Sequence, residues 1–294
     1  MRGQLPPLGR MYEAGGRRLM LHRSGTGGPP VVLLPGAGLV GLDFLNVQAG
    51  AAGFTTSVLY DRAGTGWSDA VELPRRPAEV AEELRALLGA AGVPGPYLLV
   101  GHSLGAFYAR RFAQLFPAEV AGLVLLDPGH EDMLAHVPGE LASLAEEMKP
   151  GTEPLPDLTE EQESAARGQW AQLYAGWPGE VSGPLIEHNL ASWRTAVEEV
   201  RNFETEVYEE LRRGGALPQV PVSVISAAGS NPYWARFMTE EAQRRVRAGI
   251  RGLHASLTTP GGEHRELPDA SHQYLHIEHP EEVLDTIRTL HTKL

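Results

Sequence analysis

The chain has 294 residues, of which 42% are hydrophobic and 21% charged, and its formal net charge is −12. This balance fits a soluble globular protein with a large core and disfavours nucleic acid and anionic membranes as partners. The sequence has no cysteine, which excludes disulfides, thiolate metal sites and a cysteine nucleophile. No signal-like apolar segment follows Met1 and no apolar run could span a bilayer, so we expect a cytoplasmic protein.

The first 127 residues alternate short apolar runs with segments of helical periodicity. Apolar residues spaced three and four apart predict a helix over 78–92, which Gly92 and Pro94 end. We predict an edge strand at 19–22, buried strands at 31–34, 57–60, 97–100 and 122–126, and a second helix from about 106 to 116. Strands separated by helices imply a mostly parallel sheet with helices on both faces.

Between Pro128 and Pro218 the strand signal disappears, and Glu, Ala and Leu dominate. The longest predicted helix places six apolar residues on one face, and Pro150 to Pro156 predicts a break between helices. Those six are Leu190, Trp193, Val197, Val200, Val207 and Leu211. The alternation resumes with strands at 220–225 and 263–267 and helices at 239–250 and from Pro280. The sequence therefore predicts an α/β core at 1–127 and 219–294, divided by a helical insertion at 128–218.

The pentad Gly101-His102-Ser103-Leu104-Gly105 lies between a predicted strand and a predicted helix. A G-x-S-x-G sequence in that context is typical of a nucleophile elbow, in which a tight turn exposes the serine hydroxyl. The following helix directs its N–H groups and positive dipole end toward the serine. This arrangement is suited to acyl transfer.

Four motifs in chain order carry a resemblance to the α/β-hydrolase superfamily. They are Pro35-Gly36-Ala37-Gly38, Asp61-Arg62-Ala63-Gly64-Thr65-Gly66-Trp67-Ser68, the pentad at 101–105, and Ala270-Ser271-His272 followed by Glu278-His279-Pro280. The chain resembles the serine-nucleophile branch with a helical cap, or lid, after the sixth strand. The resemblance implies a Ser-His-acid triad with Ser103 as nucleophile, and no cofactor or metal.

A serine nucleophile needs a base within hydrogen-bond reach. The resemblance places that base in the loop before the last helix, where His272 stands. The alternative for His272 is an ordinary surface histidine. We expect His102 to pack beneath the elbow, His276 and His279 to lie at the start of the last helix, and His264 to lie in a strand.

The acid that orients the base departs from the commonest family pattern. The loop after the strand at 220–225 reads Ser226-Ala227-Ala228-Gly229-Ser230-Asn231 and holds no carboxylate. The superfamily's other position, after the strand that follows the nucleophile's helix, holds Asp127. The alternative is an Asp-Pro turn that only ends a strand. Glu131, Asp132 and Asn231 are the further candidates.

The tetrahedral intermediate of acyl transfer needs two hydrogen-bond donors. We expect the backbone N–H groups of Leu104 and Ala37 to serve, although Pro35-Gly36 replaces the His-Gly pair common in the family. Asp61 and Arg62 are interpreted as a structural pair that braces the loops. The candidate pocket residues are His102, Trp170, Tyr174, Trp177 and Trp193. Some of these aromatic residues must instead pack the helical insertion onto the sheet.

The main hypothesis is a serine esterase, lipase or lactonase that acts on a small ester, thioester or lactone with an apolar portion. A second reading keeps the acyl-enzyme and changes the acceptor, as in an acyltransferase, a thioesterase or a macrolactone-processing enzyme of secondary metabolism. A third reading is a non-catalytic ligand-binding protein of the same fold. The missing acid after strand 220–225 is the sequence feature that favours the third.

Overall fold

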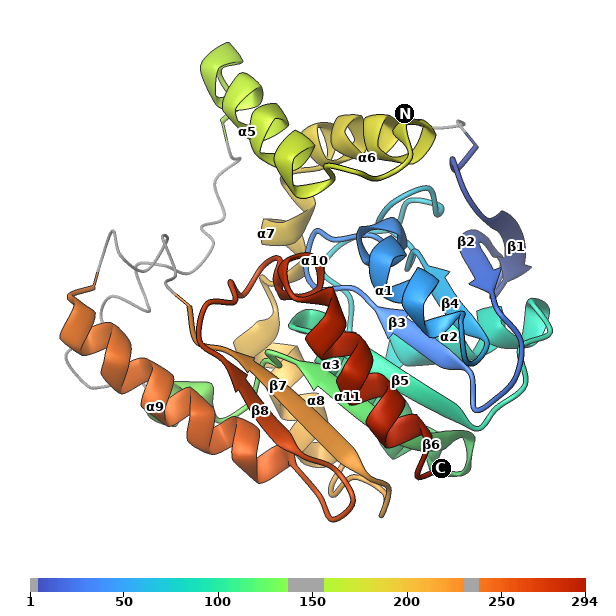
Figure 1. The fold of residues 1–294 in the computed structure, drawn as a ribbon, viewed down its shortest axis with the longest axis vertical. Coiled ribbons are helices and arrows are strands. Elements are labelled where there is room, and N and C mark those ends of the chain that lie inside the picture. The colour runs from blue at the N-terminus through green and yellow to red at the C-terminus, as the bar shows by residue number, and fades with distance from the viewer. Residues whose placement is uncertain (1–4, 137–155, 230–237) are drawn as a thin grey trace.

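A computed structural model describes residues 5–136, 156–229 and 238–294. Its centre is one eight-stranded sheet in the order β1-β2-β4-β3-β5-β6-β7-β8 (Figure 1). β2 is antiparallel to β1 and β4, and the other pairs are parallel. The strands are β1 Arg10–Ala14, β2 Arg17–Ser24, β3 Val31–Leu34, β4 Ser57–Tyr60, β5 Tyr97–His102, β6 Val120–Leu126, β7 Val222–Ala227 and β8 His264–Leu267.

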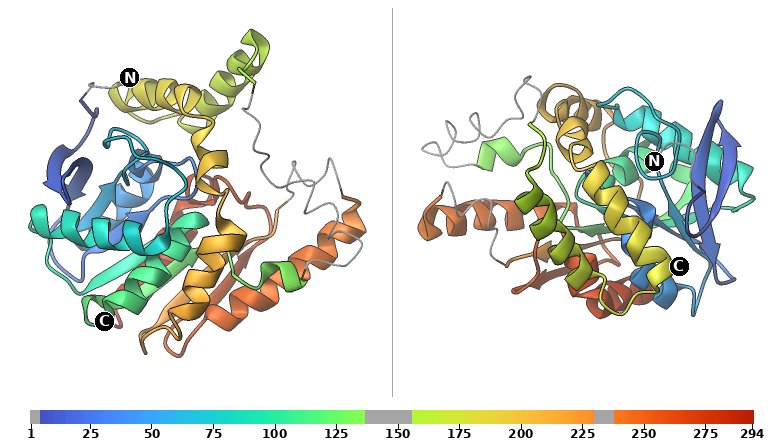
Figure 2. Two further views of the ribbon diagram at one scale, coloured as in Figure 1. Left: turned by 180° about the vertical axis from the view of Figure 1, so that it is seen from behind. Right: turned by 90° about the horizontal axis from the view of Figure 1, so that it is seen from above.

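Helices cover both faces of this sheet, which confirms the predicted architecture. α2 (Pro77–Ala90), α3 (Leu104–Leu115) and α8 (Tyr208–Arg213) pack together on one face (Figure 2). α1 (Leu45–Ala51) packs against α11 (Pro280–His291) on the other. Successive residues of the strands enter opposite cores, as Val32 and Leu34 face one core and Val31 and Leu33 the other.

The remaining helices lie at the ends and edges of the sheet. α5 (Glu160–Leu173) and α6 (Gly179–Ala191) lie above the strand ends, and α7 (Thr195–Glu199) leads down from them (Figures 1 and 2). α9 (Glu240–Leu257) packs beside β7, and α10 (Leu275–Glu278) precedes α11. Short helical turns occur at η1 Gly41–Phe44, η2 Pro117–Glu119, η3 Met133–His136 and η4 Phe203–Val207. No helix in the described ranges is long and apolar enough to cross a membrane.

The structure corrects several predictions about the elements. The segment at 19–22, predicted as an edge strand, lies in β2, which pairs with β1 on one side and β4 on the other. The single long helix expected from Leu190 to Leu211 is instead four pieces, namely the end of α6, then α7, η4 and α8. At these breaks, Ser192 Oγ donates to the His188 carbonyl just after α6, and Asn202 Nδ2 donates to the Arg75 carbonyl just before η4. β1 was not predicted, and α9 continues seven residues beyond the predicted end at residue 250. Most of the break predicted at 150–156 lies outside the described residues.

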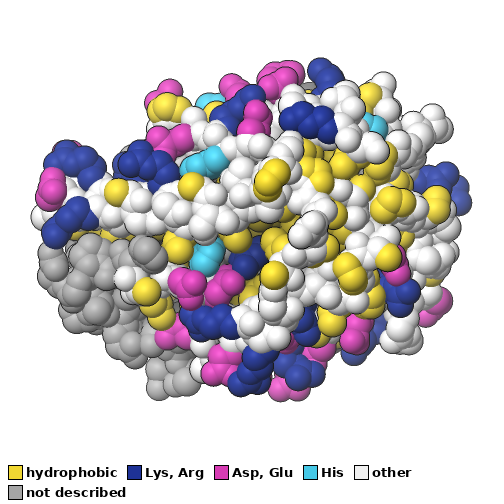
Figure 3. Space-filling model, turned by 90° about the horizontal axis from the view of Figure 1, so that it is seen from below, with side chains coloured by type: hydrophobic (Ala, Val, Ile, Leu, Met, Phe, Trp, Pro, Cys, Tyr) yellow, Lys and Arg dark blue, Asp and Glu magenta, His cyan; other side chains and the backbone are white. Residues whose placement is uncertain are grey.

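Seen from the face opposite α5 and α6, acidic and basic side chains are interspersed around the rim (Figure 3). Apolar side chains lie between them, and neither sign of charge dominates this face. The net charge of −12 is therefore not gathered into an acidic patch on this side.

Candidate active site

The sheet topology brings two loops together at the carboxyl ends of β3 and β5. After β3 the chain continues to β4 on one side, and it later returns to β5 on the other side of β3. Such a switch point leaves a crevice at the carboxyl ends of the two strands. Residues 35–38 and Ser103 meet there, since a Cβ atom on Gly36 would lie 3.3 Å from Ser103 Cβ.

Ser103 occupies a tight turn between β5 and α3. Its φ is 50° and its ψ is −114°, a conformation that side-chain-bearing residues rarely adopt. The flanking glycines allow this turn: a Cβ on Gly105 would lie 2.1 Å from the Leu34 carbonyl oxygen, and one on Gly101 would lie 2.6 Å from the Gly105 carbonyl oxygen. Strain at one serine is thus held in place by close packing on both sides.

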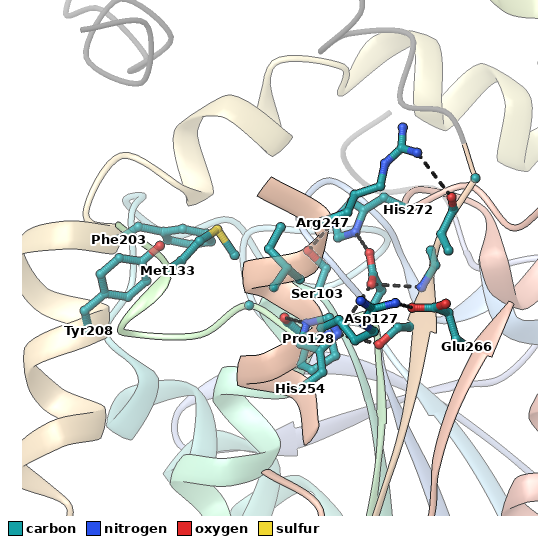
Figure 4. Close-up of a pocket in the computed structure, with 17 residues that line it drawn as sticks. Ser103, Asp127, Pro128, Met133, Phe203, Tyr208, Arg247, His254, Glu266 and His272 are labelled. Atoms are coloured by element: carbon teal, nitrogen blue, oxygen red, sulfur yellow. Dashed lines mark hydrogen bonds and ion pairs between the residues drawn. The ribbon is translucent and has the colours of Figure 1, made fainter. Parts of the chain in front are cut away.

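Ser103, His272 and Asp127 form a continuous hydrogen-bonded chain (Figure 4). Ser103 Oγ lies 3.0 Å from His272 Nε2, and His272 Nδ1 lies 2.5 Å from Asp127 Oδ2. The carboxylate can only accept, so it fixes the tautomer with the proton on Nδ1 and leaves Nε2 free to accept from the serine hydroxyl. The three residues that the sequence singled out, from the ends of β5 and β6 and the loop after β8, are brought together.

The charges within this chain favour an ionised acid beside a basic imidazole. Burial raises the pKa of Asp127, but the hydrogen bond and charge of His272 outweigh burial and lower the pKa below its ordinary value. Burial likewise lowers the pKa of His272, and Asp127 outweighs it and raises the pKa. The His272 side chain is 41% exposed, so a proton on its ring can exchange with a ligand or with water.

Asp127 is also held by its own backbone and by the next strand. Its φ is 40°, and its Oδ1 accepts from the Ala227 N–H at 3.0 Å. The other candidate acids are engaged elsewhere: Glu131 pairs with Arg110, and Asp132 bonds to Arg212. Asn231 lies outside the described residues.

His102 lies beneath the serine and contacts the histidine loop. Its Nε2–H donates to the His272 carbonyl at 2.7 Å, and burial lowers its pKa to about 3, so the ring is neutral. Its Nδ1 atom faces the 35–38 loop, where a Cβ on Gly36 would lie 2.5 Å away. His102 therefore joins three loops of the site but is not among the described residues that line the pocket.

The two predicted oxyanion donors come from the start of α3 and from the loop after β3. Leu104 is the first residue of α3, so its N–H has no partner within that helix. In the described part of the chain no hydrogen bond uses the N–H of Ala37, whereas the N–H of Gly38 donates to Glu199 Oε2 at 2.8 Å. Arg62 donates to the carbonyls of Pro35 and Gly36, so it braces the loop as expected, but its acidic partner is Glu199 rather than Asp61.

A cavity of about 280 Å³ opens beside Ser103 and His272 (Figure 4). Met133, Phe203 and Tyr208 form an apolar wall on one side, and α9 contributes Arg247, Ile250 and Arg251. The lining is completed by Asp127, Pro128, Gly129, Ser226, Ala227, Ala228, Gly229, His254 and Glu266.

None of the four predicted pocket aromatics is among the described residues that line this cavity. Trp170, Tyr174 and Trp177 pack against the apolar core on the α11 side of the sheet. The Tyr174 hydroxyl donates to buried Asp43 in η1, and the Arg194 guanidinium lies over the Trp193 ring. The structure places at least three of the four where they attach the inserted helices to the sheet.

Sequence reasoning missed a second polar cluster behind the acid. Ser226 Oγ lies 2.7 Å from His254 Nδ1 and 2.8 Å from His264 Nε2, and His254 Nε2 lies 2.8 Å from the Pro128 carbonyl oxygen. Burial lowers the pKa of both histidines. Ser226 on β7 and His254 on α9 are 28 residues apart, so no local sequence motif predicts the cluster.

The other predicted histidine positions can be placed directly. His264 begins β8, as expected. His276 is buried in α10 with its ring stacked on Phe44 at 3.8 Å, and His279 is the residue before α11. None of the three bonds to Ser103 within the described residues.

Comparison with known proteins gives a consistent result. Residues 31–286 match the sequence model of the Alpha/beta hydrolase family. A thermophilic esterase from Thermogutta terrifontis has a similar fold, with a TM-score of 0.59, 19% identity, and coverage of 96% of this chain and 98% of that chain. An enol-lactonase from Burkholderia xenovorans LB400 has a TM-score of 0.60 and 16% identity, with coverage of 96% of this chain and 100% of that chain. A putative epoxide hydrolase mutant from Pseudomonas aeruginosa has a TM-score of 0.69 and 22% identity, with coverage of 97% of this chain and 95% of that chain.

Curated relatives match over shorter stretches. The Bacillus subtilis protein YqjL, described as uncharacterized, is 35% identical over 111 residues, which are 38% of this chain and 44% of that protein. The chain thus spans less than half of the length of the first curated relatives that it matches. At identities of 16–22% these solved structures show a shared fold.

Proposed function

The chain belongs to the alpha/beta hydrolase family, and from this premise we propose that it is a serine hydrolase that cleaves carboxylic esters, including lactones. The observation that carries the proposal is the hydrogen-bonded chain from Ser103 through His272 to Asp127. Serine at the elbow favours ester cleavage over the epoxide and haloalkane chemistries of this fold, which use a carboxylate at that position.

The proposed reaction begins with attack of Ser103 Oγ on the ester carbonyl carbon while His272 Nε2 takes the hydroxyl proton. The N–H groups of Ala37 and Leu104 bind the oxyanion of the tetrahedral intermediate. The carbon–oxygen bond to the alcohol then breaks, and His272 delivers its proton to that leaving oxygen. An acyl-enzyme on Ser103 remains.

The second half of the reaction repeats these steps with water as the nucleophile. His272 Nε2 takes a proton from water as the water attacks the acyl carbon, and the proton returns to Ser103 Oγ when the acid leaves. Asp127 stays ionised throughout and stabilises the imidazolium that forms twice in each turnover. Its lowered pKa supports this role, because the carboxylate remains charged across the neutral range.

The cavity supports a small substrate with an apolar portion. A volume of about 280 Å³ is at the lower end for ligand pockets, and the wall of Met133, Phe203 and Tyr208 suits a short apolar acyl or alcohol group. We also propose that residues 128–218 act as a cap over a core formed by 1–127 and 219–294. The position of α5 and α6 above the strand ends supports that division (Figure 1).

The proposal is tested by incubation with a small fluorophosphonate, followed by intact-mass measurement and peptide mapping. We expect one adduct, on Ser103, and none in Ser103→Ala. Ser256→Ala, which changes a serine outside the pocket lining on the last turn of α9, is the matched control and should react like wild type. A folded wild-type protein that takes no adduct would refute an activated serine and favour the ligand-binding reading.

The acyl acceptor is tested separately with a chromogenic ester in water containing an added alcohol or amine. Hydrolysis alone supports the esterase reading. Dominant transfer to the added nucleophile would instead support the acyltransferase reading with the same triad.

A further inference from the structure

Glu199, the last residue of α7, forms a buried ion pair with Arg62, which follows β4. Its Oε1 accepts from Arg62 Nε at 2.6 Å, and its Oε2 accepts from Arg62 Nη2 at 2.6 Å. The side chains of Arg62 and Glu199 are 1% and 2% exposed, respectively. This is a bidentate pair with fixed geometry, and the two residues are 137 positions apart in the sequence.

The same pair holds the loop that carries the proposed oxyanion donor. Arg62 Nη1 donates to the Pro35 carbonyl at 3.0 Å, and Nη2 donates to the Gly36 carbonyl at 2.8 Å. Glu199 Oε2 accepts from the Gly38 N–H at 2.8 Å. The peptide groups on both sides of Ala37 are thereby fixed, and the Ala37 N–H is left as the donor available to a ligand.

Close packing joins α7 to this loop as well. Gly38 has φ of +71°, and a Cβ atom on it would lie 2.6 Å from Ala196 Cβ in α7. Gly38 and Ala196 are therefore in close contact, and a movement of α7 away from the loop would break this contact. A buried ion pair is weak evidence for net stability, but its bidentate geometry fixes the orientation of Arg62 relative to Glu199.

We propose that Glu199 is a positioning residue which couples the seating of α7 to the orientation of the oxyanion loop at 35–38. The proposal rests on the serine hydrolase function proposed above. When α7 is displaced, Gly38 and Arg62 lose their hydrogen-bond partner Glu199. The loop at 35–38 then no longer holds the Ala37 N–H in the orientation that binds the oxyanion. Oxyanion stabilisation then depends on whether the inserted helices are in place.

The charges of Glu199 and Arg62 lead to a second, independent prediction about the reaction rates of their variants. The carboxylate of Glu199 binds the N–H of Gly38, the residue after the proposed oxyanion donor Ala37. Its negative charge would repel an oxyanion, but the Arg62 guanidinium neutralises that charge. Removing Arg62 alone leaves an unpaired buried carboxylate beside the site. Removing both charges avoids that repulsion, so the double variant should react faster than the Arg62 variant.

The test compares Glu199→Gln, Arg62→Gln and the double variant with Glu198→Gln as the matched control. Glu198 is the neighbouring residue of α7 and makes no side-chain hydrogen bond or ion pair to the described residues. We expect Glu199→Gln to lower both kcat and the rate of phosphonate labelling about 10- to 100-fold, with a smaller change in KM, because misplacement of about 1 Å costs on that order. Arg62→Gln should lose more, and the double variant should recover part of that loss.

A readout that does not depend on activity completes the test. Hydrogen–deuterium exchange of the peptide containing Gly38 should quicken in Glu199→Gln and remain at the wild-type rate in Glu198→Gln. Equal labelling rates and equal exchange in these two variants would overturn the proposal, as would a double variant slower than Arg62→Gln. If Arg62→Gln does not fold, the comparison of Glu199→Gln with Glu198→Gln still decides. Wild-type protein without an adduct would refute the serine hydrolase function, and the exchange data would then decide the coupling alone.

Discussion

Tyr174, which follows α5, joins the helices between β6 and β7 to η1 through the buried carboxylate of Asp43, and its replacement by phenylalanine gives a quantitative test. Its hydroxyl donates to Asp43 Oδ1 at 2.5 Å and accepts from Asn189 Nδ2 at 2.9 Å. Asp43 has no exposed surface, and its other oxygen accepts from the Val40 N–H. Tyr174→Phe therefore removes one donor from a carboxylate that water does not reach.

The size of the effect depends on pH, and the sign follows from the pKa of Asp43. Burial raises this pKa from 3.8 to about 6, while the hydrogen bond from Tyr174 opposes the rise. A raised acid pKa means that the free energy of unfolding falls as pH increases from about 4 through about 6. Without the hydroxyl the pKa rises further, so the additional loss appears above pH 6. We expect a loss of about 1 kcal/mol at pH 5, where Asp43 is protonated, and about 1.5–3 kcal/mol at pH 8, where it is charged.

Urea unfolding followed by circular dichroism at the two pH values measures both losses. Tyr12→Phe is the control, since Tyr12 is half-buried in β1 and its hydroxyl bonds to no other described residue. It should cost little and equally at both pH values. A Tyr174→Phe loss that does not change with pH, or that matches the control, would refute the assigned coupling to Asp43.

Three further predictions concern the proposed triad and its support. Asp127→Asn should lower ester turnover about 10⁴-fold with an unchanged circular dichroism spectrum, and a loss under about tenfold would move the acid elsewhere. The raised pKa of His272 predicts that kcat/KM rises with pH through a pKa above 6.5, because only the neutral ring accepts a proton; a midpoint below that value would contradict it. Gly36→Ala places a Cβ 2.5 Å from His102 Nδ1 and should lower kcat about 10²-fold, whereas Gly89→Ala, which meets nothing within 4 Å, should not.

The parallel core could be predicted because its strands are apolar on both faces. The predicted limits of β3 and β4 agree with the structure, since Val31–Leu34 and Ser57–Tyr60 are buried throughout and are bounded by polar or Pro-Gly segments. β1 escaped prediction because only Ala14 of its residues Arg10–Ala14 is buried, and the strand is held by pairing with β2. The long helix was wrong because the regular apolar period from Leu190 to Leu211 does not reveal the breaks between α6, α7, η4 and α8. Asn202, at one of these breaks, donates to the Arg75 carbonyl 127 residues away.

The candidate site divides along the same line. Ser103, His272 and Asp127 could be predicted because each follows a strand. Each also occupies the position in the order of motifs where the family resemblance expects a triad residue. The wall of Phe203 and Tyr208 could not be found, since which aromatic residues face a cavity depends on how η4 and α8 pack against the sheet. Glu199 carries no sequence signal, because it acts through an arginine 137 residues away.

The strand order also bears on how the protein fails under stress. β5, which directly precedes Ser103, is paired on both sides near the middle of the sheet, whereas His272 follows β8, the last strand, which pairs only with β7. Edge elements open at lower free energy than central ones. Mild denaturant should therefore separate the imidazole from a serine that stays anchored, so activity would vanish before the backbone melts and would return on dilution. The proposed active site is therefore expected to lose its geometry at the edge of the sheet before the central strands unfold.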